Sequence, residues 1–131
     1  MHSVDRLKIA KRLSEQRPDS LPPLNICLQT NLDREASKSG ISDPLELQDL
    51  LSEVAALPRL NLAGVMAIPP AQSSIAAQRE SFAAVRHLSN TLCSRYDANE
   101  LSMGMSGDLE SAIAEGATMV RIGTDIFGAR V

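Results

Sequence analysis

Short apolar runs alternate with longer amphipathic stretches along this chain of 131 residues. The apolar runs cover residues 24–30, 62–68, 101–103 and 119–122, and a shorter run covers residues 2–4. Runs of this length fit buried strands, whereas the stretches between them repeat apolar residues at helical spacing. This alternation is typical of βα units around a parallel sheet, so we expect an α/β fold of four strands, a strand stub and four helices.

The expected helices lie between these strands. One follows Asp5, and a second begins at Asp43 and Pro44, which suit the cap and the first helical position. A third is expected over residues 74–96 and a fourth over residues 108–115. Four strands and a stub are too few to close an eight-stranded barrel.

Composition excludes several classes of partner. The net charge is -3 and the basic residues are scattered, so no nucleic-acid surface is expected. No apolar run approaches the roughly 18 residues of a membrane span, and the first residues lack the order of a secretory signal. Cys27 and Cys93 stand far apart, without the spacing of a metal site. We expect reduced thiols and a cytoplasmic location without membrane contact.

Ser106, Gly107 and Asp108 lie where an expected strand hands over to a helix. A serine hydroxyl and the N–H groups of a first helical turn form an anion site at the carboxyl end of a parallel sheet. The alternative is that Ser106 is an ordinary helix cap, which is the commoner role of such a serine.

Arg121 is an arginine in an otherwise apolar strand, directly before Gly123 and Thr124. If it points into a polar barrel mouth it can serve a ligand, and the alternative is a strand-end arginine that reaches solvent or a salt bridge. Gly123 and Thr124 let a phosphate approach the backbone closely, although an ordinary turn has the same composition. Phosphate sites in (β/α)8 barrels commonly use the loops after the last two strands, where these residues and Ser106 stand.

These segments together resemble the pyridoxal 5'-phosphate (PLP) homeostasis protein family. The similar segments span residues 37–41, 64–69, 101–106, 112–116, 120–124 and 126–130. The resemblance implies the PLP-binding barrel shared with the amino-terminal domain of alanine racemase. It further implies that residues 1–131 form the carboxy-terminal part of one such barrel domain, about the last four to five βα units of an amino-terminally truncated (β/α)8 fold.

The same resemblance assigns roles to the candidate residues. It implies that Ser106, Gly123 and Thr124 hold the cofactor phosphate and that Arg121 faces the pyridine nitrogen. An arginine at that nitrogen disfavours protonation of the ring and weakens it as an electron sink. This fits a PLP carrier better than an efficient amino-acid enzyme.

The family's Schiff-base lysine, in a Ser-Lys-Thr type motif, has no counterpart in the sequence. Lys8 and Lys11 are expected on the solvated surface of the first helix, and Lys38 lies in a long loop at the ligand end of the sheet. The expected function is therefore non-covalent PLP binding by a fragment of a PLP homeostasis protein.

Two alternatives remain open. A racemase-like PLP enzyme needs the missing lysine and a second proton-transfer group, and Tyr96 is the only tyrosine. An inactive fragment that self-associates through exposed barrel edges is the other. His2 and His87 are expected to lack a Ser or Cys partner, so no catalytic triad is expected.

Overall fold

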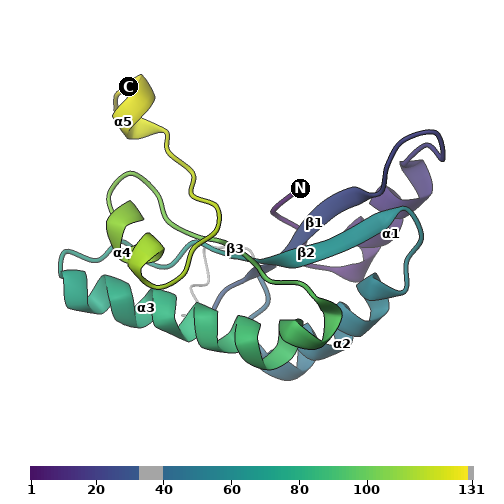
Figure 1. The fold of residues 1–131 in the computed structure, drawn as a ribbon, viewed down its shortest axis with the longest axis horizontal. Helices are drawn as coiled ribbons and strands as arrows, with labels where there is room; N and C mark the ends of the chain where they lie inside the picture. The colour runs from purple at the N-terminus through teal and green to yellow at the C-terminus, as the bar shows by residue number, and fades with distance from the viewer. Residues whose placement is uncertain (33–39, 130–131) are drawn as a thin grey trace.

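The computed structural model describes residues 1–32 and 40–129 of the chain. Its centre is a parallel sheet of three strands in the order β1-β2-β3 (Figure 1). The strands are Leu24–Thr30 (β1), Leu60–Ala67 (β2) and Glu100–Ser102 (β3). The expected α/β class with parallel strands is confirmed.

Single β-bridges extend the sheet on both sides. Val4 pairs with Leu28 of β1, and Met119 pairs with Ser102 of β3. The strand expected at residues 119–122 is therefore wrong beyond Met119. Its partner β3 ends at Ser102, and Gly104 then turns the chain with a φ of +105°. Beyond Met119 the pairing is reduced to a 2.9 Å hydrogen bond from the N–H of Arg121 to the carbonyl oxygen of Gly104.

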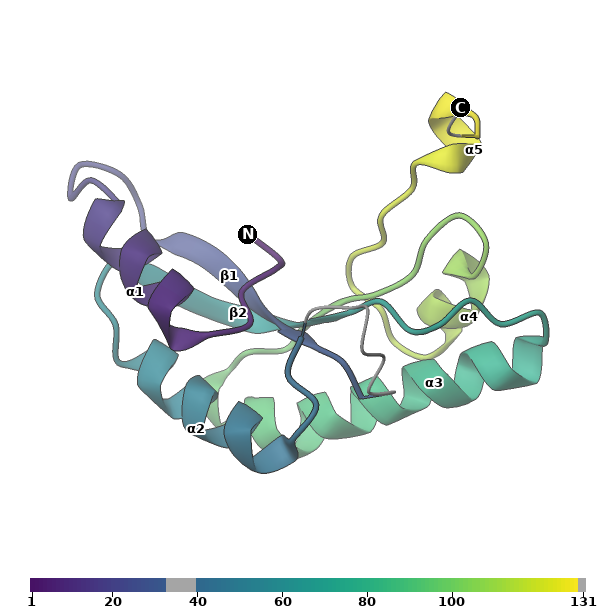
Figure 2. The same cartoon turned by 180° about the vertical axis from the view of Figure 1, so that it is seen from behind.

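Three helices cover one face of the sheet, as Figures 1 and 2 show from opposite sides. They are Leu7–Gln16 (α1), Pro44–Ala55 (α2) and Ile75–Leu88 (α3). Buried apolar side chains from these helices and from the sheet form one core that includes Ile26, Leu28, Leu47, Leu51, Val54, Val65, Phe82, Val85 and Leu101. Burial of this core supplies most of the stabilisation of the fold.

Two short helices lie near the carboxyl ends of the strands. Leu109–Ala114 (α4) lies beside α3, whereas Thr124–Phe127 (α5) stands away from the body at the end of an extended segment (Figure 1). In place of α5 the sequence led us to expect only a turn. Among the described residues, no helix is long and apolar enough to cross a bilayer.

The helix predicted over residues 74–96 is broken. α3 ends at Leu88, and a π-helical turn, Ser89–Cys93, and a 3-10 turn, Ser94–Tyr96, follow it. The hydroxyls of Thr91 and Ser94 donate hydrogen bonds of 2.8 and 2.9 Å to the carbonyls four residues earlier. Such bonds compete with the regular helical pattern, which explains the irregular end.

Gly64 allows β2 and β3 to approach closely. A Cβ atom at this position would lie 1.9 Å from the carbonyl oxygen of Glu100. No side chain fits in that gap, so the pairing of the two strands requires glycine here.

Candidate functional site

The structure brings Ser106 together with the Gly123–Thr124 turn. Ser106 lies in the loop between β3 and α4, and its Oγ accepts a 3.1 Å hydrogen bond from the backbone N–H of Asp125. Gly123 immediately precedes α5 and Thr124 is its first residue. Three of the four candidate residues therefore meet at the carboxyl end of the sheet.

The alternative that Ser106 caps the following helix is wrong. α4 begins at Leu109, and the residue at its cap position is Asp108. The Asp108 carboxylate instead accepts a 2.8 Å bond from the N–H of Met105, which closes the loop on itself. The Ser106 hydroxyl is thereby left to face α5.

Arg121 reaches across the end of β3 towards β2. Its Nη2 donates a 2.9 Å hydrogen bond to the carbonyl oxygen of Ala67, the last residue of β2. Within the described residues it forms no ion pair, so it does not end in the salt bridge that the sequence left open. Burial lowers the pKa of Arg121, and the carboxylate of Asp108 opposes this shift.

The Nε atom of Arg121 is buried and has no hydrogen-bond partner, alone among the side-chain nitrogens and oxygens of residues 1–32 and 40–129. An unsatisfied buried donor is costly unless a ligand or water meets it. No hydrogen bond in the described part of the chain joins Arg121 to Ser106. The two side chains thus form separate parts of the candidate site.

Two cavities flank the Ser106 loop. One, of about 560 Å³, is lined by Ser106, Asp108 and Asp125 together with Gln78 and Arg79 of α3. The other, of about 310 Å³, is lined mainly by apolar residues after β2 and by Met105. Gln78, Gly107 and Asp108 line both cavities and form the wall between them.

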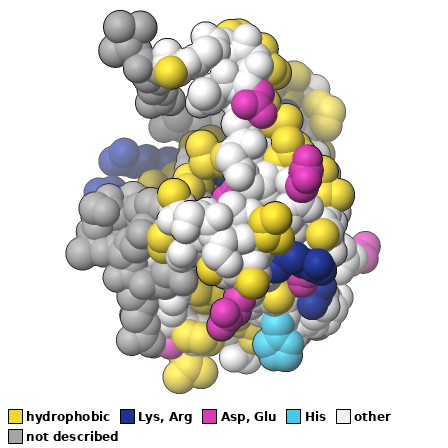
Figure 3. Space-filling view, turned by 90° about the vertical axis from the view of Figure 1, so that its left-hand side faces the viewer, with side chains coloured by type: hydrophobic (Ala, Val, Ile, Leu, Met, Phe, Trp, Pro, Cys, Tyr) yellow, Lys and Arg dark blue, Asp and Glu magenta, His cyan; other side chains and the backbone are white. Residues whose placement is uncertain are grey.

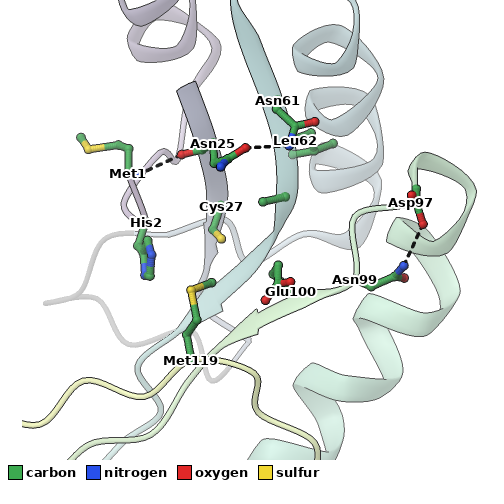
Figure 4. A pocket seen from close by; sticks show the side chains of 11 residues that line it. Met1, His2, Asn25, Cys27, Asn61, Leu62, Asp97, Asn99, Glu100 and Met119 are labelled. Carbon is green, nitrogen blue, oxygen red and sulfur yellow. Dashed lines mark hydrogen bonds between the residues drawn. The ribbon is translucent and has the colours of Figure 1, made fainter. Parts of the chain in front are cut away.

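A further cavity of about 530 Å³ lies at the opposite, amino-terminal ends of the strands (Figure 4). His2, Cys27 and Met119 line it. His2 Nδ1 lies 2.7 Å from the Oγ of Ser102, so the expectation that His2 lacks a serine partner is wrong. Ser102 stands 100 residues further along the chain, a separation that leaves no local sequence signal.

The pKa of His2 is lowered chiefly by burial and further by the amino terminus and Arg121. Because no carboxylate is seen to orient the imidazole among the described contacts, His2 and Ser102 do not form a triad. The described residues also contain no cluster of three or more His, Cys, Asp or Glu side chains suited to a metal ion.

The lysines do not approach the Ser106 loop where they are described. Lys8 and Lys11 are exposed on α1, as expected. Lys38 lies outside the described residues. Tyr96 ends the irregular extension of α3, which runs against the strand direction and so leaves the tyrosine at the end of the sheet opposite Ser106 (Figure 1).

A family model for the alanine racemase N-terminal domain matches residues 1–131. The chain belongs to the alanine racemase N-terminal domain family. The resemblance to PLP homeostasis proteins is confirmed as well. This family member is 59% identical over 130 residues to the pyridoxal phosphate homeostasis protein of Pseudomonas aeruginosa and 52% identical to that of Escherichia coli K12. The alignments cover 99% and 98% of the chain but 55% of each relative, so the chain spans about half the length of these relatives.

The fold of this chain is similar to that of PipY from Synechococcus elongatus PCC7942, of which two structures were solved. The structure without PLP superimposes with a TM-score of 0.86 at 35% identity, over 97% of the chain and 60% of PipY. The structure with PLP bound gives a TM-score of 0.81 at 33% identity, over 97% and 59%. The parallel sheet and its helices are thus shared with PipY.

Proposed function

We propose that this chain is a PLP-binding part of a PLP homeostasis protein, in which Ser106, Gly123 and Thr124 hold the phosphate and Arg121 faces the pyridine nitrogen. The names of its relatives and the PLP-bound PipY structure support the choice of cofactor. When bound, PLP supplies an electrophilic aldehyde and an electron-withdrawing ring. The residues of this chain supply the binding contacts.

The phosphate assignment is supported by free donors at one place. The backbone N–H groups of Gly123 and Thr124 make no hydrogen bond within the described residues, and a Cβ at Gly123 would meet no atom within 4 Å. Converging N–H groups and hydroxyls bind phosphate oxygens, and a short extra helix often contributes to such sites in barrels. Ser106 adds its hydroxyl from the neighbouring loop.

The observation that carries the proposal is the buried, unpartnered Nε of Arg121. Arginine remains charged even when burial lowers its pKa, so this donor can meet only an acceptor. An unprotonated pyridine nitrogen is such an acceptor. With PLP bound, this contact would keep the ring unprotonated, which suits a carrier of PLP.

We also propose that residues 1–131 belong to one barrel domain and supply about the last four to five units of a (β/α)8 barrel.

Single bridges at Val4 and Met119 leave both margins of the sheet with little pairing, which favours self-association of the isolated chain. Ile126 and Phe127 of α5 are 67% and 83% exposed. Figure 3 shows hydrophobic side chains interspersed with polar ones on one face of the molecule. Free, buried Cys27 and Cys93 fit a reducing cytoplasm.

Titration of the purified chain with PLP tests the proposal by the absorbance change of the cofactor and by thermal protection. We expect saturable binding that borohydride does not make permanent, because no lysine is assigned to a covalent bond. Absence of saturable binding would refute the proposal. A borohydride-trapped lysine together with racemisation of an amino acid would favour the enzyme alternative.

A further inference from the structure

We propose that Gln78 of α3 is a positioning residue for phosphate recognition: its side-chain amide holds the Ser106 loop in the conformation that presents the Ser106 hydroxyl to α5. The inference rests on the proposed PLP site but adds a residue outside it. Gln78 acts through its hydrogen bonds to the loop.

Both ends of the Gln78 amide are hydrogen-bonded. Its Nε2 donates to the carbonyl oxygens of Gln72, at 2.9 Å, and Gly107, at 3.5 Å. Its Oε1 accepts a 2.7 Å bond from the hydroxyl of Ser111 on α4. Carbonyl oxygens only accept, so the nitrogen must face them and the orientation of the amide is fixed.

Two hydrogen bonds between Met105 and Asp108 close the turn that contains Ser106 and Gly107, and few other contacts restrain the middle of this turn. Gly107 is exposed, and a Cβ built on it would meet no atom within 4 Å, so packing does not hold it. Glycine also has the widest backbone freedom of any residue. The Gln78 contact on its carbonyl therefore restrains the residue directly after Ser106.

α3 is a firm base for this contact. Phe82 and Val85 bury its inner face against the core, with 1% and 3% exposure. The buried carboxylate of Glu115, next to the end of α4, binds Arg79 at 3.1 Å and Arg86 at 3.2 Å, both on α3. α3 is thus held to the end of α4 by these ion pairs and to Ser111 within α4 by Gln78 itself.

The position of Gln78 also separates the two cavities beside the loop. It lines the cavity that contains Ser106 and Asp125 and the apolar cavity next to Met105. Without the amide, the wall loses its link between α3 and Gly107. The hydroxyl of Ser106 then loses its fixed distance to the N–H of Asp125, now 3.1 Å.

Gln78→Leu removes the hydrogen bonds and keeps a similar volume. Gln48→Leu, on α2, is the matched control at a similarly half-buried position. We expect Gln78→Leu to weaken PLP binding by about 10-fold while pyridoxal, which has no phosphate, binds as it does to the parent. Equal losses for both ligands, or no loss, would overturn the inference.

Amide hydrogen exchange separates this inference from the proposed function, because it needs no ligand. In Gln78→Leu the N–H of Asp125 should exchange about 10-fold faster than in the parent, and Gln48→Leu should leave it unchanged. If the parent does not bind PLP, the proposed function fails, yet faster exchange still supports the positioning role. Unchanged exchange overturns that role whatever the chain binds.

Discussion

Arg121 donates a 2.9 Å hydrogen bond from Nη2 to the carbonyl oxygen of Ala67, which lies 54 residues earlier at the end of β2. This bond spans the end of β3 and fixes the direction of the guanidinium. It leaves the buried Nε without a partner, and this is the donor that we propose faces the ligand. Position 121 thus combines an observed structural contact with the proposed binding contact, and the two can be measured by different assays.

Arg121→Met should weaken PLP binding by at least about 10-fold, because it removes both the charge and the Nε donor. It should also lower the free energy of unfolding by about 1 kcal/mol through loss of the bond to Ala67. PLP titration and urea denaturation measure the two effects. The exposed Arg12→Met on α1 is the control, and a PLP affinity equal to that of the parent in Arg121→Met would contradict the assignment.

Ser106→Ala should reduce PLP affinity by roughly 10-fold and leave pyridoxal affinity unchanged, since the hydroxyl is assigned to the phosphate. Inorganic phosphate should also compete less well with PLP for this variant than for the parent. Ser52→Ala, at an exposed position on α2, should bind both ligands as the parent does. Parallel loss of PLP and pyridoxal binding would point to a disturbed fold instead of a phosphate contact.

Gly64→Ala should destabilise the chain by about 3 kcal/mol, because the new Cβ collides with the backbone of Glu100. Gly107→Ala is the contrasting variant, since nothing lies within 4 Å of a Cβ there, and its effect should stay within about 0.5 kcal/mol. Chemical denaturation of both variants provides the measurement. Similar stabilities for the two would show that β2 and β3 do not pair as described.

Stability should fall as the pH drops below 6.5, the ordinary pKa of histidine. The pKa of His2 is lowered in the folded state, so protonation favours the unfolded chain, and the penalty grows until the pH passes the folded pKa. His2→Gln should flatten the stability profile between about pH 7 and about pH 5, whereas the His87→Gln control should retain it. Thermal unfolding across this range tests the prediction, and an unchanged slope in His2→Gln would contradict it.

The two thiols should react with a disulfide reagent only when the chain unfolds. Burial raises the pKa of Cys93 to about 11 and also raises that of Cys27, so little thiolate forms near neutral pH. The amount of thiolate that the reagent releases, measured with and without urea, gives the comparison. Fast modification of the native chain at Cys27, which lines the cavity in Figure 4, would show that this cavity opens to solvent.

Local patterns predicted the regular parts of the fold. β1 spans the seven residues expected from its apolar run, and α2 begins at Pro44 with the Asp43 side chain bonded to the N–H of Leu45. Both signals lie within a few neighbouring residues, and burial of the apolar side chains agrees with them. Where local preference and tertiary packing coincide, sequence is a sufficient guide.

Contacts between distant residues set what the sequence could not predict. The direction of Arg121 depends on a carbonyl 54 residues away, and the partner of His2 is 100 residues away. The helix α5 was not predicted, because its four residues are too few to show a periodic pattern. Ser106 was expected to share a phosphate site with Gly123 and Thr124 because such sites in barrels use the loops after the last two strands, but only the structure shows its hydrogen bond to Asp125.

The order of the strands in the sheet is the order of the strands in the chain. Asn25 of β1 meets Asn61 of β2 at a separation of 36 residues, and β3 follows β2 at a similar interval. Each new strand of the sheet therefore pairs with the strand that precedes it in the chain, and this pairing does not require a segment that lies far away along the sequence. A ribosome releases such a chain in an order in which every finished strand already has its neighbour, so assembly can proceed during synthesis.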